Sequence, residues 1–307
     1  MGTIAVSDNR KASNVRNNRS SDTVMEVMVY TFAAIFLVIL IYPLYFIVIA
    51  SFSDPSAVGS GQVNLVPKGF TLDGYKELFR HDNIWAGYRN TIFYTIVGTA
   101  IGVIVNISAA YAMSRKELVG RNGLSIFFII TMFFNGGLIP TFMTIRDLHL
   151  YNTFWVMVVP FSVSVYNIIV ARTFFQTSIP NDLWEAAQLD GCGHIRYFIR
   201  VVLPLSKAIV AVLGLWIAVS QWNSYFNALI YLKKQNLYPL QLVLRNILIT
   251  NQMQSSLGSG EAAQIAMRLA NLMRYSVIIV ATVPIMCVYP FIQKYFNQGV
   301  MIGAVKE

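Results

Sequence analysis

Stretches of apolar residues alternate with polar segments along most of this chain. Six of them are each about as long as the roughly 20 residues with which a helix crosses a bilayer, and none of the six contains Asp, Glu, Lys, Arg or His. The pattern therefore predicts an all-α integral membrane protein with six transmembrane helices. The expected spans are Val27–Ala50, Thr91–Met113, Leu124–Ile145, Thr153–Ala171, Ile209–Leu232 and Tyr275–Gln293.

The overall composition agrees with this pattern. Hydrophobic residues make up 56% of the chain and charged residues 12%, whereas soluble proteins average roughly half apolar and a quarter charged residues. The first stretch, Val27–Ala50, is too long for the apolar core of a signal peptide, which spans about 7 to 15 residues. We expect it to remain in the protein as a membrane anchor.

The short connections between spans indicate the orientation. Arg115, Lys116 and Arg121 crowd the connection between the second and third spans, whereas Arg146 is alone in the next one. Because short loops rich in Lys and Arg stay in the cytoplasm, both termini are predicted to be cytoplasmic. The net charge of +9 is explained in the same way, since the basic residues are scattered between spans and no nucleic-acid-binding motif occurs. We expect no nucleic-acid partner.

Three regions are expected along the chain. Residues 1–26, rich in Asn, Ser and Arg, are predicted to form a flexible cytoplasmic tail, residues 27–293 the six-helix membrane domain, and residues 294–307 a cytoplasmic C-terminal tail. Cys192 and Cys287 cannot meet on this topology. Neither a disulfide nor a metal site is expected.

A charged segment punctuated by glycines, residues 178–205, lies between the fourth and fifth spans. Pro180 fits the first turn of a short helix, and Ser178 or Asp182 could cap that turn, with Glu185 completing a capping box after Asp182. Gly191 and Gly193 should end the helix. A second helical piece, Ile195–Val202, then leads to Pro204. The segment is predicted to form a helix, a turn and a helix at the membrane surface.

One side of the first short helix is predicted to contact a partner. Leu183, Trp184, Ala187 and Gln188 recur at the three- and four-residue spacing that places side chains on one helix face. Ala186, Ala187 and Gly191 would keep this side shallow.

The same segment carries a recognisable motif. The residues Glu185, Ala186, Ala187, Gly191, Val201, Leu203 and Pro204 resemble the EAA motif of bacterial ABC-importer permeases, with Val201 where that family usually has Ile. A second EAAQ at Glu261–Gln264 lacks the glycine and the Leu-Pro pair, so we interpret it as a chance match. The resemblance implies that the loop is a coupling helix seated on an ATPase subunit. It implies an ATPase-coupling set of Leu183, Trp184, Glu185, Ala186, Ala187, Asp190, Gly191, Leu203 and Pro204.

Four further segments resemble the MalG-like permeases of carbohydrate importers, in particular their LplC/YtcP-like branch: Gly136–Phe142, Asn152–Trp155, Ala171–Pro180 and the tail Lys294–Glu307. This resemblance implies the type I importer permease fold in a bacterial cell membrane. It also implies a heterodimer with a second permease subunit, two cytoplasmic ATPase subunits, an external substrate-binding protein and a sugar or oligosaccharide substrate. No P-loop of the form GxxxxGK[ST] occurs, so ATP hydrolysis is assigned to the separate ATPase, and this chain is expected to be no enzyme and to need no cofactor.

Two long segments, 51–90 and 233–274, are expected outside the membrane. The second contains two helix-like pieces, Leu240–Thr250 and Glu261–Arg274, separated by the flexible sequence SSLGSG. The resemblance implies that this loop reaches toward the external binding protein. A lid that packs on the protein's own outer face is the alternative.

Within the spans, neutral polar and aromatic side chains are the candidates for contact with substrate. Proton- and ion-coupled carriers commonly use an ionisable group inside the membrane, and the charge-free spans disfavour that class. Hydrogen-bonding groups and flat apolar faces suit sugars, although hydrogen bonds between helices would explain the same residues. The candidates for a substrate pathway are Asn135, Tyr166, Asn167, Gln221, Trp222, Asn223, Tyr225 and Asn227.

Small residues and prolines indicate how the spans pack. Gly98 and Gly102 have the four-residue spacing of close helix packing, and Pro160 and Pro284 interrupt the fourth and sixth spans. Two other functions remain open: a non-transporting sensor or scaffold with the permease fold, and an ABC permease for a solute other than a sugar.

Overall fold

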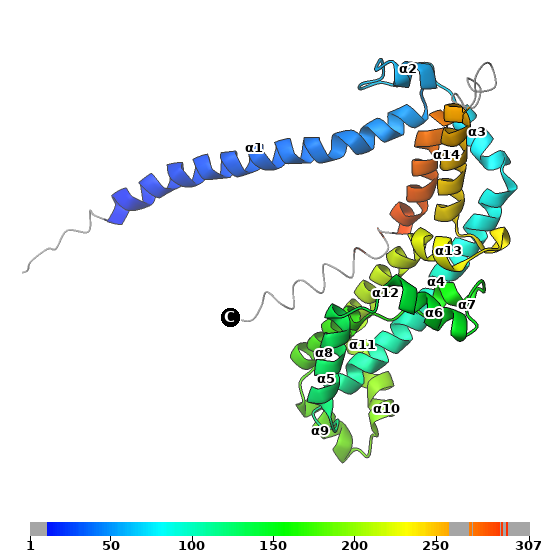
Figure 1. The fold of residues 1–307 in the computed structure, drawn as a ribbon. Coiled ribbons are helices and arrows are strands. Elements are labelled where there is room, and N and C mark those ends of the chain that lie inside the picture. Colours follow the sequence, from blue (N-terminus) through cyan, green and yellow to red (C-terminus); the bar gives the residue numbers. More distant parts are fainter. Residues whose placement is uncertain (1–10, 258–269, 272, 289, 291–292, 294–307) are drawn as a thin grey trace, which may run out of the picture. The chain divides into compact units, whose positions relative to one another are not determined.

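The computed structural model describes residues 11–257, 270, 271, 273–288, 290 and 293 (Figure 1). Every regular element in this part of the chain is helical. The chain divides into two compact units, residues 1–72 and 73–307.

The first unit contains one long apolar helix. Helix α1, Lys11–Ser51, includes the stretch Thr23–Ser51, which is long and apolar enough to cross a membrane. Nearly all side chains of that stretch are exposed within the chain. A helix satisfies its own backbone hydrogen bonds, so its apolar side chains can face lipid or another subunit. Asp54 then begins the short helix α2, Pro55–Gly59, by accepting a hydrogen bond from the backbone N–H of Ser56 at 2.9 Å.

The second unit is built around helix α4. In chain order its helices are α3 (Asp73–Arg80), α4 (Asp82–Ser114), α5 (Arg121–Phe133), α6 (Leu138–Asp147), α7 (Trp155–Val158), α8 (Val165–Ser178), α9 (Asp182–Leu189), α10 (His194–Tyr197), a π-helical turn (Phe198–Val202), α11 (Leu203–Leu205), α12 (Lys207–Trp222), α13 (Tyr225–Tyr231), a 3₁₀ turn (Gln235–Leu237) and α14 (Leu240–Leu257). An apolar helix at Met273–Val288 follows. Helix α4 packs against α8, α12 and α14 (Figure 1).

Glycines let two partners approach α4 closely, which confirms the packing role predicted for them. A Cβ atom on Gly98 would lie 2.5 Å from Nε2 of Gln221 in α12. A Cβ atom on Gly102 would lie 2.6 Å from the carbonyl oxygen of Ser162. Both distances are far shorter than van der Waals contact, so neither position can hold a larger residue without movement.

The third expected span is bent. Helices α5 and α6 meet at 114°. At the break, Oδ1 of Asn135 accepts a hydrogen bond from the N–H of Gly137 at 2.8 Å, and Gly137 has a positive φ of 86°. A left-handed glycine and an Asx turn both end a helix, which explains why the apolar run Leu124–Ile145 is not one straight rod.

The fourth and fifth expected spans are also interrupted, the fourth near Pro160, where the sequence indicated a break, and the fifth at a position that it did not indicate. In the fourth, α7 and α8 are separated by residues 159–164, which include Pro160. Proline lacks the N–H that would continue the helix. In the fifth, α12 ends at Trp222 and α13 begins at Tyr225.

The count of membrane spans follows from these breaks. Within the described residues, two helices are long and apolar enough to cross a membrane, or up to four if each bent pair counts as one span. The second bent pair joins His194–Leu205 to α12 at 83°. The six spans stay a prediction.

The described part of the second long segment expected outside the membrane packs on the chain itself. The predicted helix Leu240–Thr250 is confirmed as the longer α14, whose residue Leu240 is fully buried. The backbone N–H of Leu240 donates to Oγ1 of Thr91 in α4 at 2.7 Å, and Nδ2 of Asn90 donates to the carbonyl oxygen of Tyr238 at 3.0 Å. This part behaves as the lid that was the alternative. Most of the predicted helix Glu261–Arg274 lies outside the described residues.

Candidate functional site

Helix α9, the first short helix of the 178–205 segment, begins differently from the prediction. Asn181 occupies the N-cap position and makes no side-chain hydrogen bond to the backbone. Its Nδ2 instead donates to Oε1 of Glu185 at 2.8 Å. The capping roles predicted for Ser178 and Asp182 are therefore wrong, because Ser178 ends α8 and Asp182 is already the first helical residue. Asp182 and Glu185 still lie in the first turn, where the helix dipole favours negative charge.

The end of α9 is fixed by a glycine, as predicted for Gly191. Its φ is 72°, and its N–H donates to the carbonyl oxygen of Gln188 at 2.9 Å. The N–H of Cys192 donates to the carbonyl oxygen of Ala187, also at 2.9 Å. This pair of bonds is a Schellman motif, which satisfies the last carbonyl groups of a helix. Gly193 does not share this role, because its φ of −78° is ordinary and it forms the N-cap of α10.

Trp184 holds α9 against the rest of the unit. Its side chain is 2% exposed. The indole ring stacks on the His194 ring, with centroids 4.3 Å apart, and lies 5.0 Å from the Tyr197 ring. Its Nε1 donates to Oε1 of Glu117 at 3.1 Å. The prediction that Trp184 belongs to a partner-facing side was wrong. The large apolar surface of the indole ring is instead buried against His194 and Tyr197 of α10.

The same side of α9 joins a larger apolar cluster. We call it the loop-side cluster; its main members are Tyr111 of α4, Phe175 of α8, Trp184 of α9, Tyr197 of α10 and Leu213 of α12. Ala187 and Cys192 pack against it and are partly buried. Burial raises the pKa of the Tyr197 phenol through desolvation, and the positive charge of Arg115 opposes this shift. The cluster connects the short loop helix directly to three long helices.

The opposite side of α9 is exposed. We call this surface the α9 face; its members are Leu183, Glu185, Ala186, Leu189, Asp190 and Gly191. Leu189 is 90% exposed, and Ile195 across the turn is 78% exposed. The sequence analysis missed both; two aliphatic residues flanking a glycine turn in a charged segment could have indicated them. A Cβ atom on Gly191 would meet nothing within 4 Å, so the face is open as well as shallow.

Leu203 and Pro204 lie beyond this face, in the helix that leads to α12. Leu203 packs against the loop-side cluster, whereas Pro204 is exposed. The preceding turn, Phe198–Val202, is π-helical. Because Pro204 has no N–H to donate to the carbonyl group four residues earlier, the helix widens before it.

The chain matches a family of known proteins over nearly its whole length. Residues 11–302 match the family described as "Binding-protein-dependent transport system inner membrane component". The chain belongs to this family. It is 36% identical over 285 residues to the polygalacturonan/rhamnogalacturonan transport system permease protein YtcP of Bacillus subtilis, covering 92% of this chain and 98% of that protein. It is 37% identical over 268 residues to the protein LplC of the same organism, covering 87% and 90%.

A solved structure agrees with these relatives. One chain of a bacterial ABC transporter involved in the import of the acidic polysaccharide alginate matches with a TM-score of 0.80 and 30% identity, covering 96% of this chain and 100% of that one. The resemblance to carbohydrate-importer permeases noted from the sequence is thereby confirmed. The all-helical architecture described above is the ABC permease fold.

The pathway residues predicted for this permease are not gathered at one place. Gln221 is 3% exposed and its Nε2 donates to Oγ of Ser162 at 3.1 Å. Trp222 is also buried, and its Nε1 donates to the carbonyl oxygen of Ala281 at 3.0 Å. Asn223 and Tyr225 are exposed at the break between α12 and α13, and Asn227 is partly buried in α13. The first two residues make the interhelical hydrogen bonds that were the alternative explanation.

The remaining three pathway candidates of the permease lie elsewhere. Asn135 shapes the bend between α5 and α6. Tyr166 is more than half exposed and stacks on Trp216 of α12, with centroids 5.8 Å apart, whereas its neighbour Asn167 is buried in α8. Tyr166 thus presents an aromatic face beside α12.

A buried amide that the sequence analysis missed links these helices. Asn106 of α4 is fully buried, and its Nδ2 donates to the carbonyl oxygens of Gly102 at 2.6 Å and Ser162 at 2.9 Å. Its Oδ1 accepts from the N–H of Ser164 at 3.0 Å. The amide replaces helix hydrogen bonds lost where the fourth stretch is interrupted. A single Asn within a long apolar span was the only sequence signal.

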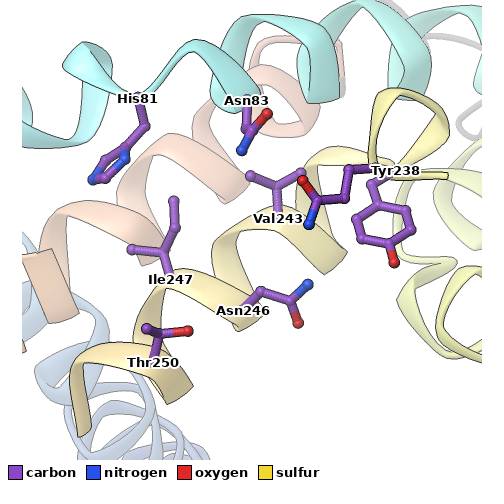
Figure 2. A pocket seen from close by; sticks show the side chains of 8 residues that line it. His81, Asn83, Tyr238, Val243, Asn246, Ile247 and Thr250 are labelled. Atoms are coloured by element: carbon purple, nitrogen blue, oxygen red, sulfur yellow. The ribbon is translucent and has the colours of Figure 1, made fainter. Parts of the chain in front are cut away.

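A polar pocket joins the two segments of the permease expected outside the membrane. It has a volume of about 220 Å³ and lies between the start of α4 and α14. Figure 2 shows the side chains of His81 and Asn83 pointing toward α14. None of its lining residues is Asp, Glu, Lys or Arg, and their amide and hydroxyl groups can form hydrogen bonds with sugar hydroxyls. The lining residues are His81, Asn83, Gln235, Tyr238, Val243, Asn246, Ile247 and Thr250.

Proposed function

We propose that this permease is the membrane-spanning subunit of an ATP-driven importer for a sugar or oligosaccharide. In this proposal it forms the pathway together with a second permease subunit, two cytoplasmic ATPase subunits bind beneath the pair, and an external binding protein delivers the substrate. The observation that carries the proposal is the α9 face, an exposed shallow surface on a helix that is firmly attached to the membrane unit. The family relationship and the named relatives support the carbohydrate class.

The geometry suggests how the coupling works. When ATP closes the ATPase dimer, the docked α9 moves with it. Trp184 transfers the displacement to α10 and to the 115–120 connection, because its ring and its Nε1 contact both. The loop-side cluster then carries the motion to α4, α8 and α12 as packed bodies. Glu185 and Asp190 would bind basic or backbone groups of the ATPase, and Leu189 would fill an apolar hollow.

The substrate is expected to be a saccharide rather than a single charged solute. YtcP is named for polygalacturonan and rhamnogalacturonan, and the solved relative is involved in the import of alginate. The polar pocket of Figure 2 offers amide and hydroxyl groups for sugar hydroxyls at the expected outer face. A screen of galacturonate oligomers and neutral dextrins against the co-purified binding protein would assign the class.

One substitution pair tests the docking role. Gly191→Asp places a charged side chain in open space on the α9 face, and Asp tolerates a φ of 72° better than most residues. Gly61→Asp is the matched control, since Gly61 has a φ of 69°, has open space around it, and lies in the segment expected outside the membrane. We expect Gly191→Asp to abolish substrate-stimulated ATP hydrolysis by the complex and Gly61→Asp to retain it. Equal stimulation in both variants would contradict the docking role.

The orientation is tested independently. Leu189→Cys in a background with Cys192 and Cys287 replaced by Ser should react with an impermeant maleimide in inside-out vesicles and not in intact cells. Labelling from outside would place the α9 face beyond the reach of any ATPase. Uptake of radiolabelled oligosaccharide into vesicles that contain the complete complex separates an importer from a sensor or scaffold that does not transport.

A further inference from the structure

Basic side chains gather around the end of α4 and the start of α5. Arg115, Lys116 and Arg121 line a pocket of about 370 Å³ whose other walls come from α8 and from residues 179–181. Helices α5 and α8 pack together, and both lie with α9 near the same end of α4 (Figure 1). Arg172 lies on α8 one turn before the pocket residue Gln176. Three positive charges therefore line the pocket, and a fourth, Arg172, lies close by on the same helix as its wall.

These charges lack acidic partners. Among the described residues, no carboxylate oxygen lies within 4.0 Å of Arg115, Lys116, Arg121 or Arg172, although such pairs occur elsewhere, as between Arg80 and Glu77. The two nearby carboxylates already accept other hydrogen bonds: that of Glu117 from Trp184, and that of Glu185 from Asn181. Both carboxylates keep their negative charge when they accept these bonds, but the four basic side chains in and beside the pocket outnumber them, so the net charge of this group is positive.

The fourth charge, Arg172, is partly buried and incompletely bonded. Arg172 donates through Nη1 to Oγ of Ser125 at 2.8 Å, but its Nε is buried without a hydrogen-bond partner. Ser125 in turn donates to the carbonyl oxygen of Arg121 at 2.6 Å. A buried donor without a partner costs free energy. A hydrogen-bond acceptor that entered between α5 and α8 could bond to this Nε and would be stabilised there.

Another charge is held in place by aromatic rings. The guanidinium of Arg115 lies over the Tyr111 ring, 4.9 Å from its centroid, and 5.7 Å from the centroid of Tyr197. Cation–π contacts of this kind fix the guanidinium. A fixed guanidinium loses less side-chain entropy when it binds an oxyanion.

The level of the pocket relative to the apolar helices identifies its ligand. Helix α4 ends at Ser114, α5 begins at Arg121 and α8 ends at Ser178, so the pocket lies where three apolar helices leave the hydrocarbon region. Next to it, α5 exposes the aliphatic and aromatic side chains of Ile126, Phe127 and Ile130. A positive pocket followed by an apolar surface matches a lipid with an anionic headgroup.

We propose that this pocket binds the phosphodiester of an anionic phospholipid from the cytoplasmic leaflet. Arginine guanidinium groups bind phosphate oxygens through two parallel hydrogen bonds, and Lys116 adds a third cation at the rim. The acyl chains lie along α5. The proposal depends on neither the identity of the imported substrate nor the docking of an ATPase.

The test measures lipid binding to the full-length chain in an uncharged detergent. Dioctanoyl phosphatidylglycerol is titrated and its occupancy followed by native mass spectrometry. In the variant Lys116→Gln/Arg121→Gln, we expect the dissociation constant to rise about 25-fold, taking about fivefold for each cation near the headgroup. The control variant, Arg196→Gln/Arg200→Gln, removes the same charge from exposed positions outside the pocket and should change binding less than twofold.

Two further probes identify the ligand's source. Dioctanoyl phosphatidylcholine should bind weakly and equally to the parent and both variants. Inorganic phosphate should displace phosphatidylglycerol only at concentrations at least 100-fold above those of the lipid. Equal weakening by the control variant would show diffuse attraction to the basic loop and overturn the site. Displacement by inorganic phosphate at concentrations similar to the lipid's would overturn the assignment to a lipid. Matching elution profiles and melting temperatures establish that both variants are folded.

Discussion

The close approach of Gly102 to the backbone of Ser162 gives the sharpest prediction. In Gly102→Ala, the new Cβ atom would lie 2.6 Å from the carbonyl oxygen of Ser162 and 3.0 Å from Cδ1 of Ile217. Ordinary contact begins at 3.4 Å, so the oxygen must move by about 0.8 Å, the difference between 3.4 and 2.6 Å. Because this oxygen belongs to the backbone, no side-chain rotation can relieve the clash.

The expected cost combines three effects. Overpacking of a well-filled interior costs about 1–3 kcal/mol. The displaced oxygen would also weaken its hydrogen bond from Asn106, now 2.9 Å long, at a further cost of about 1 kcal/mol. The better helix propensity of alanine offsets about 1 kcal/mol. A net loss of about 2 kcal/mol corresponds to a fall in the melting temperature of roughly 4–8 °C.

The assay is a fluorescence-detected thermal melt of the purified chain in detergent. Gly123→Ala is the matched control, because Gly123 lies in an apolar helix and a Cβ there would meet nothing within 4 Å; its melting temperature should stay equal or rise. A second comparison uses Gly98→Ala, where the clash is with the movable side chain of Gln221. Adding Gln221→Ala should recover most of the stability lost at position 98. Equal melting of Gly102→Ala and Gly123→Ala would refute the packing argument.

Three further substitutions follow from the same structure. Trp184→Ala removes a buried indole and should weaken the attachment of α9 by about 3–5 kcal/mol, seen as faster hydrogen exchange across residues 182–197; Glu117→Gln, which keeps the acceptor, should cost about 1 kcal/mol or less. Asn106→Leu removes the hydrogen bonds to Gly102, Ser162 and Ser164 and should cost about 2–4 kcal/mol of stability, seen as a lower melting temperature. An unchanged melting temperature would show that the amide is dispensable. Gly191→Ala forces alanine into a left-handed conformation at a cost of about 1–2 kcal/mol, while Gly191→Asn should cost less, and identical melts would contradict the role of the Schellman turn.

Much of the loop could be predicted from local chemistry. Gly191 ends α9 because only a residue without a Cβ adopts its φ at little cost, and this requirement is visible in the sequence. The cap at the other end was mispredicted, since Ser178, Asn181 and Asp182 are all suitable residues and the end of α8 decides among them. Spacing grouped Trp184 with Ala187 on one side of α9, but that side was assigned to a partner. It could not show that α10 and Glu117 cover this side.

For the predicted pathway residues, too, the sequence indicated the kind of side chain but not its surroundings. Gln221 and Trp222 have the polarity expected of a sugar site, but each makes its hydrogen bond within the protein. Whether a polar group faces a channel or a neighbouring helix depends on what lies opposite, and no local pattern contains that information. The bends in the third, fourth and fifth apolar stretches arise at Gly137, near Pro160 and at Asn223, residues that favour breaks without requiring them.

The sequence by itself determined the all-helical class, the apolar stretches, the glycine turn of the 178–205 segment and the family. These follow from hydrophobicity, backbone freedom and a spaced motif, all of which are properties of residues close together in the chain. Only the tertiary structure decided which side of α9 is free, which amides are already bonded, and that Arg115, Lys116 and Arg121 line one pocket with residues of α8. These depend on contacts between residues tens of positions apart, where the energy of each side chain is set by neighbours that the fold supplies.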